Sequence, residues 1–458
     1  MTDVDPRLEH GAQRNPPVAG PTPGEVVSEP QRERARRVPG PTGNGRLRLT
    51  LLAAAVVALC VWSGRSMAVM ILSLIVIITL HELGHYLTAR AAGMKVTEFF
   101  MGFGPRLWSV QRGETEYGVK LIPAGAYVKI AGMHNLDDVD PADEARTYRQ
   151  KSYLRRLSVA VAGSAMHFAI ALVLLFTVLV GWGAPGARLF SSDQEQNWQV
   201  GLVEPASAAA TAGLQVGDRI VAFDAGSVET FEDLAAFVAV NPGREVSVTV
   251  DRGGELSTLP LTIGTRPTGD VNQPERGFLG IGRGYRIERL GPIEAVPAAF
   301  ADFGTLTWET VKGMGRIFSP SGLSSYARQV FTPSSTDDGV AQGPVGEEPA
   351  EDGRLVSIYG ASRIGAGLLD AGVDRFLVFL VLLNVFIGLF NLVPLLPLDG
   401  GHVAIATYER LREIGRGGRR YFVDVAKLLP VTYAVVTVLV FIGLSSLYLD
   451  IAQPLPTP

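Results

Sequence analysis

The sequence predicts a multi-pass α-helical membrane protein with an inserted α+β module outside the cytoplasm and a β-hairpin on the cytoplasmic side. Three observations lead to this class. Long apolar runs are separated by polar stretches along the 458 residues. Charged residues make up only 19% of the chain, below the roughly one quarter that is usual in soluble domains. A polar region in the middle alternates short β-type segments with turns, which is typical of a small folded module.

Five apolar runs determine the expected spans. They cover residues 49–62, 67–80, 157–182, 376–396 and 428–448. A spanning helix needs about 20 mostly apolar residues. The last three runs reach that length, and the second reaches it if the helix continues through "HELGHYLTARAAG". We therefore expect transmembrane helices at 67–92, 155–183, 373–400 and 428–449.

The N-terminal region has two parts, a polar segment over 1–47 and a short apolar run over 48–64. The polar segment is rich in Pro, Gly and Arg and cannot bury a core, which predicts a disordered cytoplasmic tail. The apolar run has the length of a signal-peptide core, but it begins behind a long polar segment. We expect an extra transmembrane helix at 48–64, and a cleaved signal peptide is the alternative.

Arginines in the tail and in "YERLREIGRGGRR" orient the chain, because Lys and Arg gather on the cytoplasmic side of membrane proteins. With the tail inside, the loop over 93–154 and the basic loop over 401–427 both lie in the cytoplasm. Residues 184–372 and the short tail over 450–458 then lie outside.

The loop over 93–154 contains "GETEYGVKLIPAGAYVKIAGM". Its two strand-like halves are joined by Pro123, Ala124 and Gly125, which predicts a β-hairpin. An ordinary cytosolic loop with two strands is the alternative.

The outer region divides into a folded module over 184–265 and an amphipathic and loop-like region over 266–372. The module contains the β-type segments "WQVGLVE", "DRIVAFD", "REVSVTVDR" and "LSTLPLTIG". With "AGLQVGDRIVAFDAGSVETFEDL" in its middle, it resembles a PDZ domain. The resemblance implies capture of an extended peptide at a sheet edge.

His81 and His85 are four residues apart, which puts both imidazoles on one face of a helix. Glu82 lies beside them, and this HExxH pattern suits a zinc ion with Glu82 as general base. The pattern also arises by chance in soluble helices, but here two of only six histidines follow an apolar run. Since Cys60 is the single cysteine, a cysteine-rich zinc site is excluded.

A third ligand is expected at membrane depth, because catalytic zinc commonly has three protein ligands and one open position. Asp399 in "NVFIGLFNLVPLLPLDGGHV" is the best candidate, at the inner end of the span over 373–400. Pro394 and Pro397 break the helix before it. Asn391 is expected to bond a substrate carbonyl or an unwound strand, and packing between helices is the alternative.

The motif "HELGH", the segment "GFGPRLWSVQRGETEYGVKLIPAGAYVKIAGM", the PDZ-like module and "NLVPLLPLDGGH" follow one another over residues 67–450. This order resembles the bacterial site-2 proteases, which are intramembrane zinc metalloproteases. The resemblance implies zinc bound by His81, His85 and Asp399, with Glu82 as the base.

The same resemblance implies that the hairpin near 114–132 is associated with the membrane and presents an edge to an unwound substrate. It implies that the PDZ-like module is an external filter. The expected substrates are single-pass membrane proteins, such as anti-sigma factors, that a site-1 protease has already cut.

One departure from the family pattern lies early in the span over 155–183. Many relatives have Gly-Pro and then Asn, whereas "AGSAMHF" has Ser164 after Gly163 and His167 in place of the Asn. We expect Gly163 and His167 on the substrate side, where His167 stabilises an oxyanion or contacts substrate. Helix packing is the alternative for His167. His402 is expected to support Asp399 or to lie at the membrane interface.

The sequence thus predicts a zinc-dependent intramembrane protease of the bacterial plasma membrane, with its site near the cytoplasmic side. The alternative is a non-catalytic PDZ scaffold or chaperone, which would have no need of Glu82. A soluble zinc protease with one anchor is a third hypothesis, and the dispersed motifs argue against it. No basic patch interleaved with aromatic residues is present in the sequence, so nucleic acid is not an expected partner.

Overall fold

The computed structural model describes most of the chain from residue 63 onward. The described ranges are 63–133, 137–191, 198–224, 226–266, 276–331 and 355–453, with the single positions Leu47, Thr50 and Ala54 before them. The expected disordered tail over 1–47 and the expected extra helix over 48–64 therefore lie almost entirely outside the described residues. Residues 454–458 of the expected C-terminal tail lie outside them too.

Four of the described helical segments are long and apolar enough to cross a membrane. They are α3 (Arg65–Ala91), α5 (Ala162–Gly181), α11 (Val373–Asn391) and the segment Val425–Ala452, which contains η4 (Val425–Leu428) and α13 (Leu429–Ala452). Their length and composition agree with the prediction of an α-helical membrane protein.

Two of these helices are shorter than expected because the chain turns at one end of each. The expected helix over 155–183 is divided at Val161 into α4 (Tyr153–Ala160) and α5, and α4 packs against α12 (Asp399–Gly415). The expected helix over 373–400 ends at Asn391, ahead of the two prolines. Proline has no N–H to donate and clashes with the preceding helical turn, so α12 begins only at Asp399.

The helices α3 and α5 cross closely near Gly84. A Cβ atom added at Gly84 would lie 2.7 Å from the carbonyl oxygen of Ala162, so no side chain fits between the two backbones. α3 ends at Ala91, and Gly93 just beyond it has a φ of 69°, the left-handed conformation that favours glycine after a helix. The close crossing places the histidine-bearing turns of α3 directly against the start of α5.

The strands β1 (Val96–Arg112) and β2 (Thr115–Ile130) form a curled antiparallel hairpin that turns at Gly113. Residues 98–101 of β1 pair with two parts of β2, namely 116–119 on one side and 126–129 on the other. The second half of β2 therefore lies at an outer edge of the sheet.

The predicted pairing across Pro123, Ala124 and Gly125 is wrong. Both strand-like halves belong to β2, and a segment of β1 lies between them. The sequence analysis did not assign β1, although it holds aromatic residues that favour strands, such as Phe99 and Phe100.

A small α+β module extends from Trp198 to Tyr285, beyond the expected boundary at residue 265. Its four-stranded sheet has the order β6-β5-β7-β8, formed by β5 (Arg219–Phe223), β6 (Gly226–Ser227), β7 (Glu245–Arg252) and β8 (Glu255–Thr262). A second pair joins β4 (Trp198–Val203) to β11 (Ile281–Tyr285). The helices are α6 (Ala208–Thr211) and α7 (Phe231–Ala239), and α7 starts at a capping box of Thr230 and Asp233.

The buried side chains of the module form one hydrophobic core that includes Trp198, Ile220, Val248 and Leu279. Because β11 supplies the partner of β4, the core closes only when residues past the expected boundary are included. The short strands β9 (Gly264–Arg266) and β10 (Arg276–Phe278) pair beside it.

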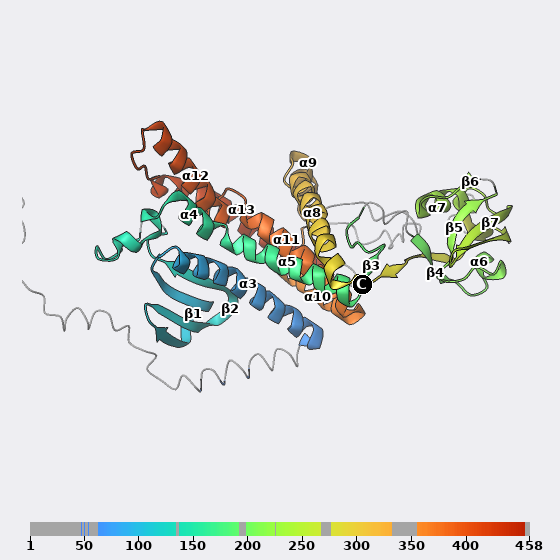
Figure 1. Ribbon diagram of the computed structural model, residues 1–458, viewed down its shortest axis with the longest axis horizontal. Coiled ribbons are helices and arrows are strands. Elements are labelled where there is room, and N and C mark those ends of the chain that lie inside the picture. The colour runs from blue at the N-terminus through green and yellow to red at the C-terminus, as the bar shows by residue number, and fades with distance from the viewer. Residues whose placement is uncertain are drawn as a thin grey trace, which may run out of the picture.

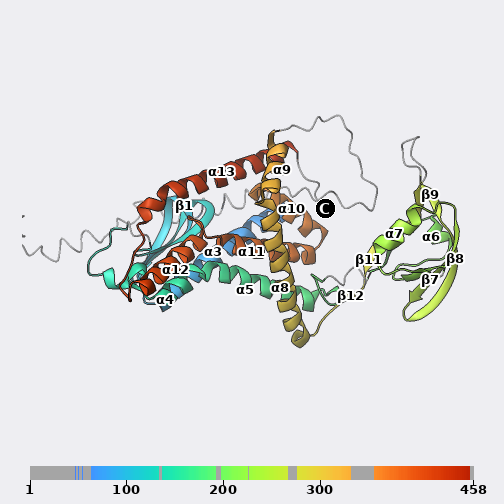
Figure 2. The same ribbon diagram turned by 90° about the horizontal axis from the view of Figure 1, so that it is seen from above.

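The module lies at one end of the molecule (Figure 1). It is joined to the helices through β3 (Ala184–Pro185), which pairs with β12 (Ile287–Glu288). α8 (Pro292–Ile317) then crosses α5 and α11, and α9 (Pro320–Phe331) continues toward α13 (Figure 2). α10 (Ile358–Ala371) packs on α3 and α11. Two single-turn helices, η1 (Glu144–Arg146) and η2 (Tyr148–Gln150), precede α4.

Candidate active site

Three potential metal ligands meet between α3 and the start of α12. Nε2 of His85 lies 3.2 Å from Nε2 of His81 and 3.2 Å from Oδ2 of Asp399. Nε2 of His81 lies 3.4 Å from the same carboxylate oxygen. Ligand atoms about 2.0–2.2 Å from a tetrahedral zinc ion are about 3.3 Å apart, so the three atoms fit one zinc ion. Among the described residues, these three form the one group of His, Cys, Asp and Glu with such spacing.

The orientation of His85 is determined by its second ring nitrogen. Nδ1 of His85 lies 2.7 Å from the carbonyl oxygen of Val159 in α4. A carbonyl oxygen can only accept, so Nδ1 carries the hydrogen and Nε2 presents its lone pair toward Asp399. Histidine ligands of metals usually have such a partner, which holds the ring in place.

Gly163 leaves the space in which the two imidazoles meet. A Cβ atom added at Gly163 would lie 2.5 Å from Nε2 of both His81 and His85. Any side chain at this position would displace the ligands. The structure places Gly163 against the ligand atoms, and its expected contact with substrate stays a prediction.

Asp399 is positioned by the tight turn between α11 and α12. α12 begins at Asp399 and continues with two glycines. A Cβ atom at Gly400 would collide with the carbonyl groups of Leu392 and Val393, and one at Gly401 would lie 2.7 Å from the nitrogen of Leu396. The sequence "LDGG" is therefore what allows the chain to fold back and direct the carboxylate to α3.

Glu82 lies on α3 between the two histidines and faces the hairpin. Its carboxylate interacts with the backbone amide of Val128 in β2 and is within electrostatic range of His85 and Asp399. α3 and β2 are packed together. The candidate base therefore lies between the ligand cluster and the outer edge of the sheet.

His167 lies on α5 beside the ligand cluster. Its ring centroid is 5.0 Å from that of His81, and Nδ1 lies 2.9 Å from Oδ1 of Asn384 in α11. The sequence analysis did not select Asn384, although a polar residue inside an apolar run is a signal of function. Asn391 is half-buried, and no hydrogen bond of its side chain occurs within the described part of the chain.

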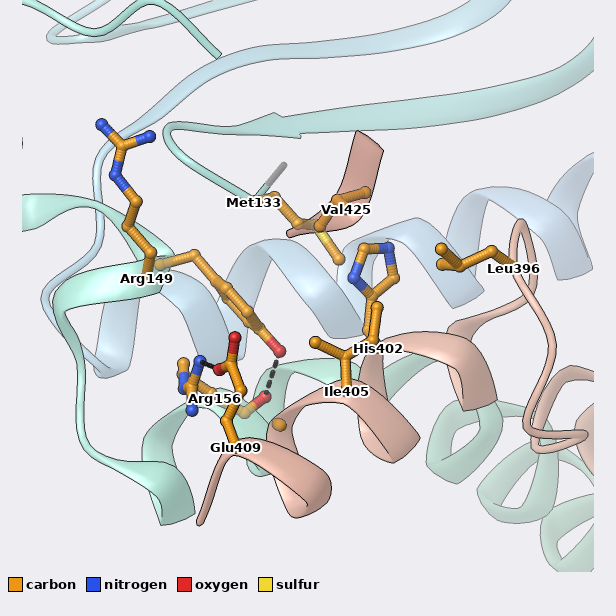
Figure 3. Close-up of a pocket in the computed structure, with 10 residues that line it drawn as sticks. Met133, Arg149, Arg156, Leu396, His402, Ile405, Glu409 and Val425 are labelled. Atoms are coloured by element: carbon orange, nitrogen blue, oxygen red, sulfur yellow. Dashed lines mark hydrogen bonds and ion pairs between the residues drawn. The ribbon is translucent and has the colours of Figure 1, made fainter. Parts of the chain in front are cut away.

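His402 lies on α12 next to a small cavity of about 20 Å³, large enough for one water molecule (Figure 3). Its ring faces Tyr148 at a centroid distance of 6.4 Å. Arg156 of α4 and Glu409 of α12, which also line this cavity, form a buried ion pair that the sequence analysis did not anticipate. The second carboxylate oxygen of Glu409 accepts from the backbone N–H of Val423 at 2.7 Å. These contacts tie the helix that carries Asp399 to α4.

Comparison with known proteins identifies the family of this chain. The model of peptidase family M50 matches residues 69–434. The chain belongs to this family. The resemblance to site-2 proteases is thereby confirmed, and so is the prediction of a peptidase.

Three relatives of this M50 chain have names that refer to the same chemistry. Zinc metalloprotease Rip1 of Mycobacterium tuberculosis is 33% identical over 411 residues, which are 84% of this chain and 96% of the relative. Zinc metalloprotease Rip1 of Mycolicibacterium smegmatis is 34% identical over 414 residues, with the same coverage of both chains. Metalloprotease MmpA of Caulobacter vibrioides is 30% identical over 361 residues, covering 73% of this chain and 84% of the relative.

Proposed function

We propose that this M50 peptidase hydrolyses a peptide bond of a membrane protein at a zinc site formed by His81, His85 and Asp399. The observation that carries the proposal is the meeting of these three donor atoms, all within 4.8 Å of one another, from helices 314 residues apart. A ligand set of two imidazoles and one carboxylate suits catalytic zinc and leaves one position open. The zinc metalloproteases among the relatives support this choice of metal.

The zinc ion would polarise the scissile carbonyl and make a water molecule a stronger acid. Glu82 takes the proton of that water and delivers it to the leaving amine, as a general base and then a general acid. Its place beside the ligands and next to the β2 backbone supports this role. Asn391 and Gly163 stay our proposed contacts with the substrate backbone.

The outer edge of β2 is the proposed binding surface for the substrate chain. Residues 126–129 pair with β1 on one side only, so their other side has backbone groups available to an added strand. A transmembrane helix must unwind before its peptide bonds are accessible, and an extended segment can add to such an edge. Because Glu82 interacts with Val128 in this strand, an added segment would run past the base.

The remaining parts of the proposal concern location and substrate. The protein is a multi-pass protein of a bacterial plasma membrane, with the zinc site near the cytoplasmic side and the module at 198–285 outside. The basic loop over 401–427, directly after Asp399, supports this orientation. The module acts as a PDZ-type filter, and the substrates are single-pass proteins, such as anti-sigma factors, already cut by a site-1 protease.

A cleavage assay tests the proposal. Detergent-solubilised protein is incubated with a tagged single-pass membrane protein whose outer domain has been removed. Cleavage by the wild type, and its loss in Glu82→Gln and Asp399→Ala, is the expected result. The alternative of a PDZ scaffold or chaperone predicts binding without cleavage. Equal cleavage by the wild type and Glu82→Gln would contradict the proposed role of the base.

A further inference from the structure

A buried polar pair lies beside the ligand cluster. His167 of α5 and Asn384 of α11 are 1% and 0% exposed, and His167 Nδ1 is 2.9 Å from Asn384 Oδ1. The side-chain nitrogen of Asn384 donates to the carbonyl of Leu380 at 2.7 Å. Since this nitrogen is the donor group of the amide, the amide oxygen faces His167 and accepts. The hydrogen between the two side chains is therefore carried by Nδ1 of His167.

This assignment determines what the other ring nitrogen of His167 can do. In a neutral imidazole one nitrogen carries the hydrogen and the other has a lone pair. Nε2 of His167 is therefore an acceptor. In this tautomer Nε2 of His167 has no hydrogen to donate, so His167 cannot stabilise an oxyanion through this atom as expected.

His81 has a ring N–H that lacks an acceptor. Its Nε2 points to His85 and Asp399, so Nδ1 carries the hydrogen whenever Nε2 binds a metal. Nδ1 of His81 is buried and has no hydrogen-bond partner among the described residues. Histidine ligands usually donate this second N–H to an acceptor, and His85 does so to Val159.

The two rings lie close enough for such a donation, although no hydrogen bond joins them among the described residues. The centroids of His81 and His167 are 5.0 Å apart, with their planes at 51°. Two imidazoles joined by an N–H···N bond have centroids about 5 Å apart, because each nitrogen is about 1.1 Å from its centroid and the bond spans about 2.9 Å. The backbone of Gly163, which also interacts with His81, is the competing acceptor.

We propose that His167 is a positioning residue of the metal site, whose Nε2 accepts the Nδ1–H of His81 while Asn384 holds His167 in the required tautomer. This inference rests on the proposed function, because it assumes that His81 is a metal ligand. Asn384, His167 and His81 then connect α11, α5 and α3, and the orientation of one ligand depends on a side chain two helices away.

Metal affinity tests the role without using activity. The full-length Glu82→Gln protein in detergent is the parent, and zinc affinity is measured by competition with a chromogenic chelator. His167→Phe and Asn384→Leu are expected to weaken zinc binding about 10- to 100-fold, the usual effect of losing a partner of a histidine ligand. Asn384→Asp keeps an acceptor for His167 Nδ1–H and is expected to retain the affinity of the parent.

A spectrum and two controls separate positioning from folding. Cobalt-loaded His167→Phe is expected to show a changed absorption spectrum, whereas His167→Gln, which retains an acceptor oxygen, recovers part of the affinity. Phe168→Leu changes the next residue of α5, which packs on Phe303, and is the matched control with unchanged affinity. Thermal unfolding of each variant shows whether the helices remain assembled.

Three outcomes decide the matter. Unchanged zinc affinity and an unchanged cobalt spectrum in His167→Phe would overturn the inference and leave the Gly163 backbone as the partner of His81. An equal loss of affinity in Asn384→Asp and Asn384→Leu would also overturn it, because the acceptor would then be irrelevant. Absence of zinc binding in the parent itself would instead contradict the proposed function.

Discussion

Arg156 of α4 and Glu409 of α12 form a buried ion pair, with side chains 7% and 2% exposed. The hydroxyl of Tyr148 donates to the carbonyl of Arg156 at 3.2 Å, and burial raises the pKa of this tyrosine, which stays protonated. Because α12 begins with Asp399, the pair connects a proposed metal ligand to the segment that precedes α5. Arg156 and Glu409 are 253 positions apart in the sequence, and their contact holds α12 against α4.

Breaking this pair is expected to destabilise the protein. Glu409→Gln leaves the guanidinium of Arg156 buried without its counter-charge, which costs about 3–5 kcal/mol. The free energy of unfolding in detergent is the measurement. The double variant Arg156→Met, Glu409→Leu removes both charges and is expected to recover most of the loss. A single variant as stable as the wild type would contradict the buried pairing.

Gly163→Ala is expected to weaken zinc binding strongly. The added methyl group would lie 2.5 Å from Nε2 of both His81 and His85 and would push the rings apart. Equilibrium dialysis with zinc measures the effect. Gly181→Ala is the matched control at the other end of α5, since a methyl group there meets nothing within 4 Å. Similar zinc binding by the two variants would show that the space at Gly163 is unimportant.

Removing the metal is expected to stop cleavage and to leave the module at 198–285 folded. The proposed ligands lie on α3 and α12, and the core of the module contains none of them. Chelation followed by hydrogen exchange of β5, β7 and β8 measures the second effect, and added zinc restores cleavage. Loss of protection in these strands after chelation would contradict the separation of the two parts.

Asp218 is expected to make the module sensitive to acid. Burial raises the pKa of its carboxyl. Hydrogen bonds from the Arg252 guanidinium and the Gln215 backbone lower the pKa by more than burial raises it, so the net pKa is below the usual value. A carboxyl with a depressed pKa stabilises the fold above its unfolded pKa of about 4 and loses this contribution as the pH falls through the folded value.

The measurement for Asp218 is hydrogen exchange of β5 and β7 between pH 5 and pH 2.5 in the full-length protein. The wild type is expected to lose protection as the pH falls, whereas Asp218→Asn starts less protected and changes less. Glu255→Gln is the control, because Glu255 is an exposed carboxylate at the start of β8. Parallel profiles for Asp218→Asn and the wild type would rule out this carboxylate as the source.

Local sequence predicted the elements that carry their own signal. Four of the five apolar runs give helices near the expected positions, and the spacing of His81 and His85 puts them on one face of α3. The prolines predicted a break before Asp399, but α11 already ends at Asn391, earlier than the expected helix over 373–400. The strand pairing was missed because both halves of β2 pair with β1, and β1 precedes the segment that was assigned as a hairpin. The module boundary was missed because β11, the partner of β4, lies far from β4 in the sequence.

The sequence by itself determined which residue types are available for the chemistry of this protein: an HExxH turn at the end of an apolar helix, an aspartate behind a proline break, and a single cysteine. These are properties of neighbouring residues, which spacing along one helix makes visible. Only the tertiary structure decided that Asp399 reaches the two histidines, that Gly163 leaves room for their rings and that Asn384 contacts His167. Those relations join helices far apart in the chain, and their distances depend on packing between helices that no local pattern encodes.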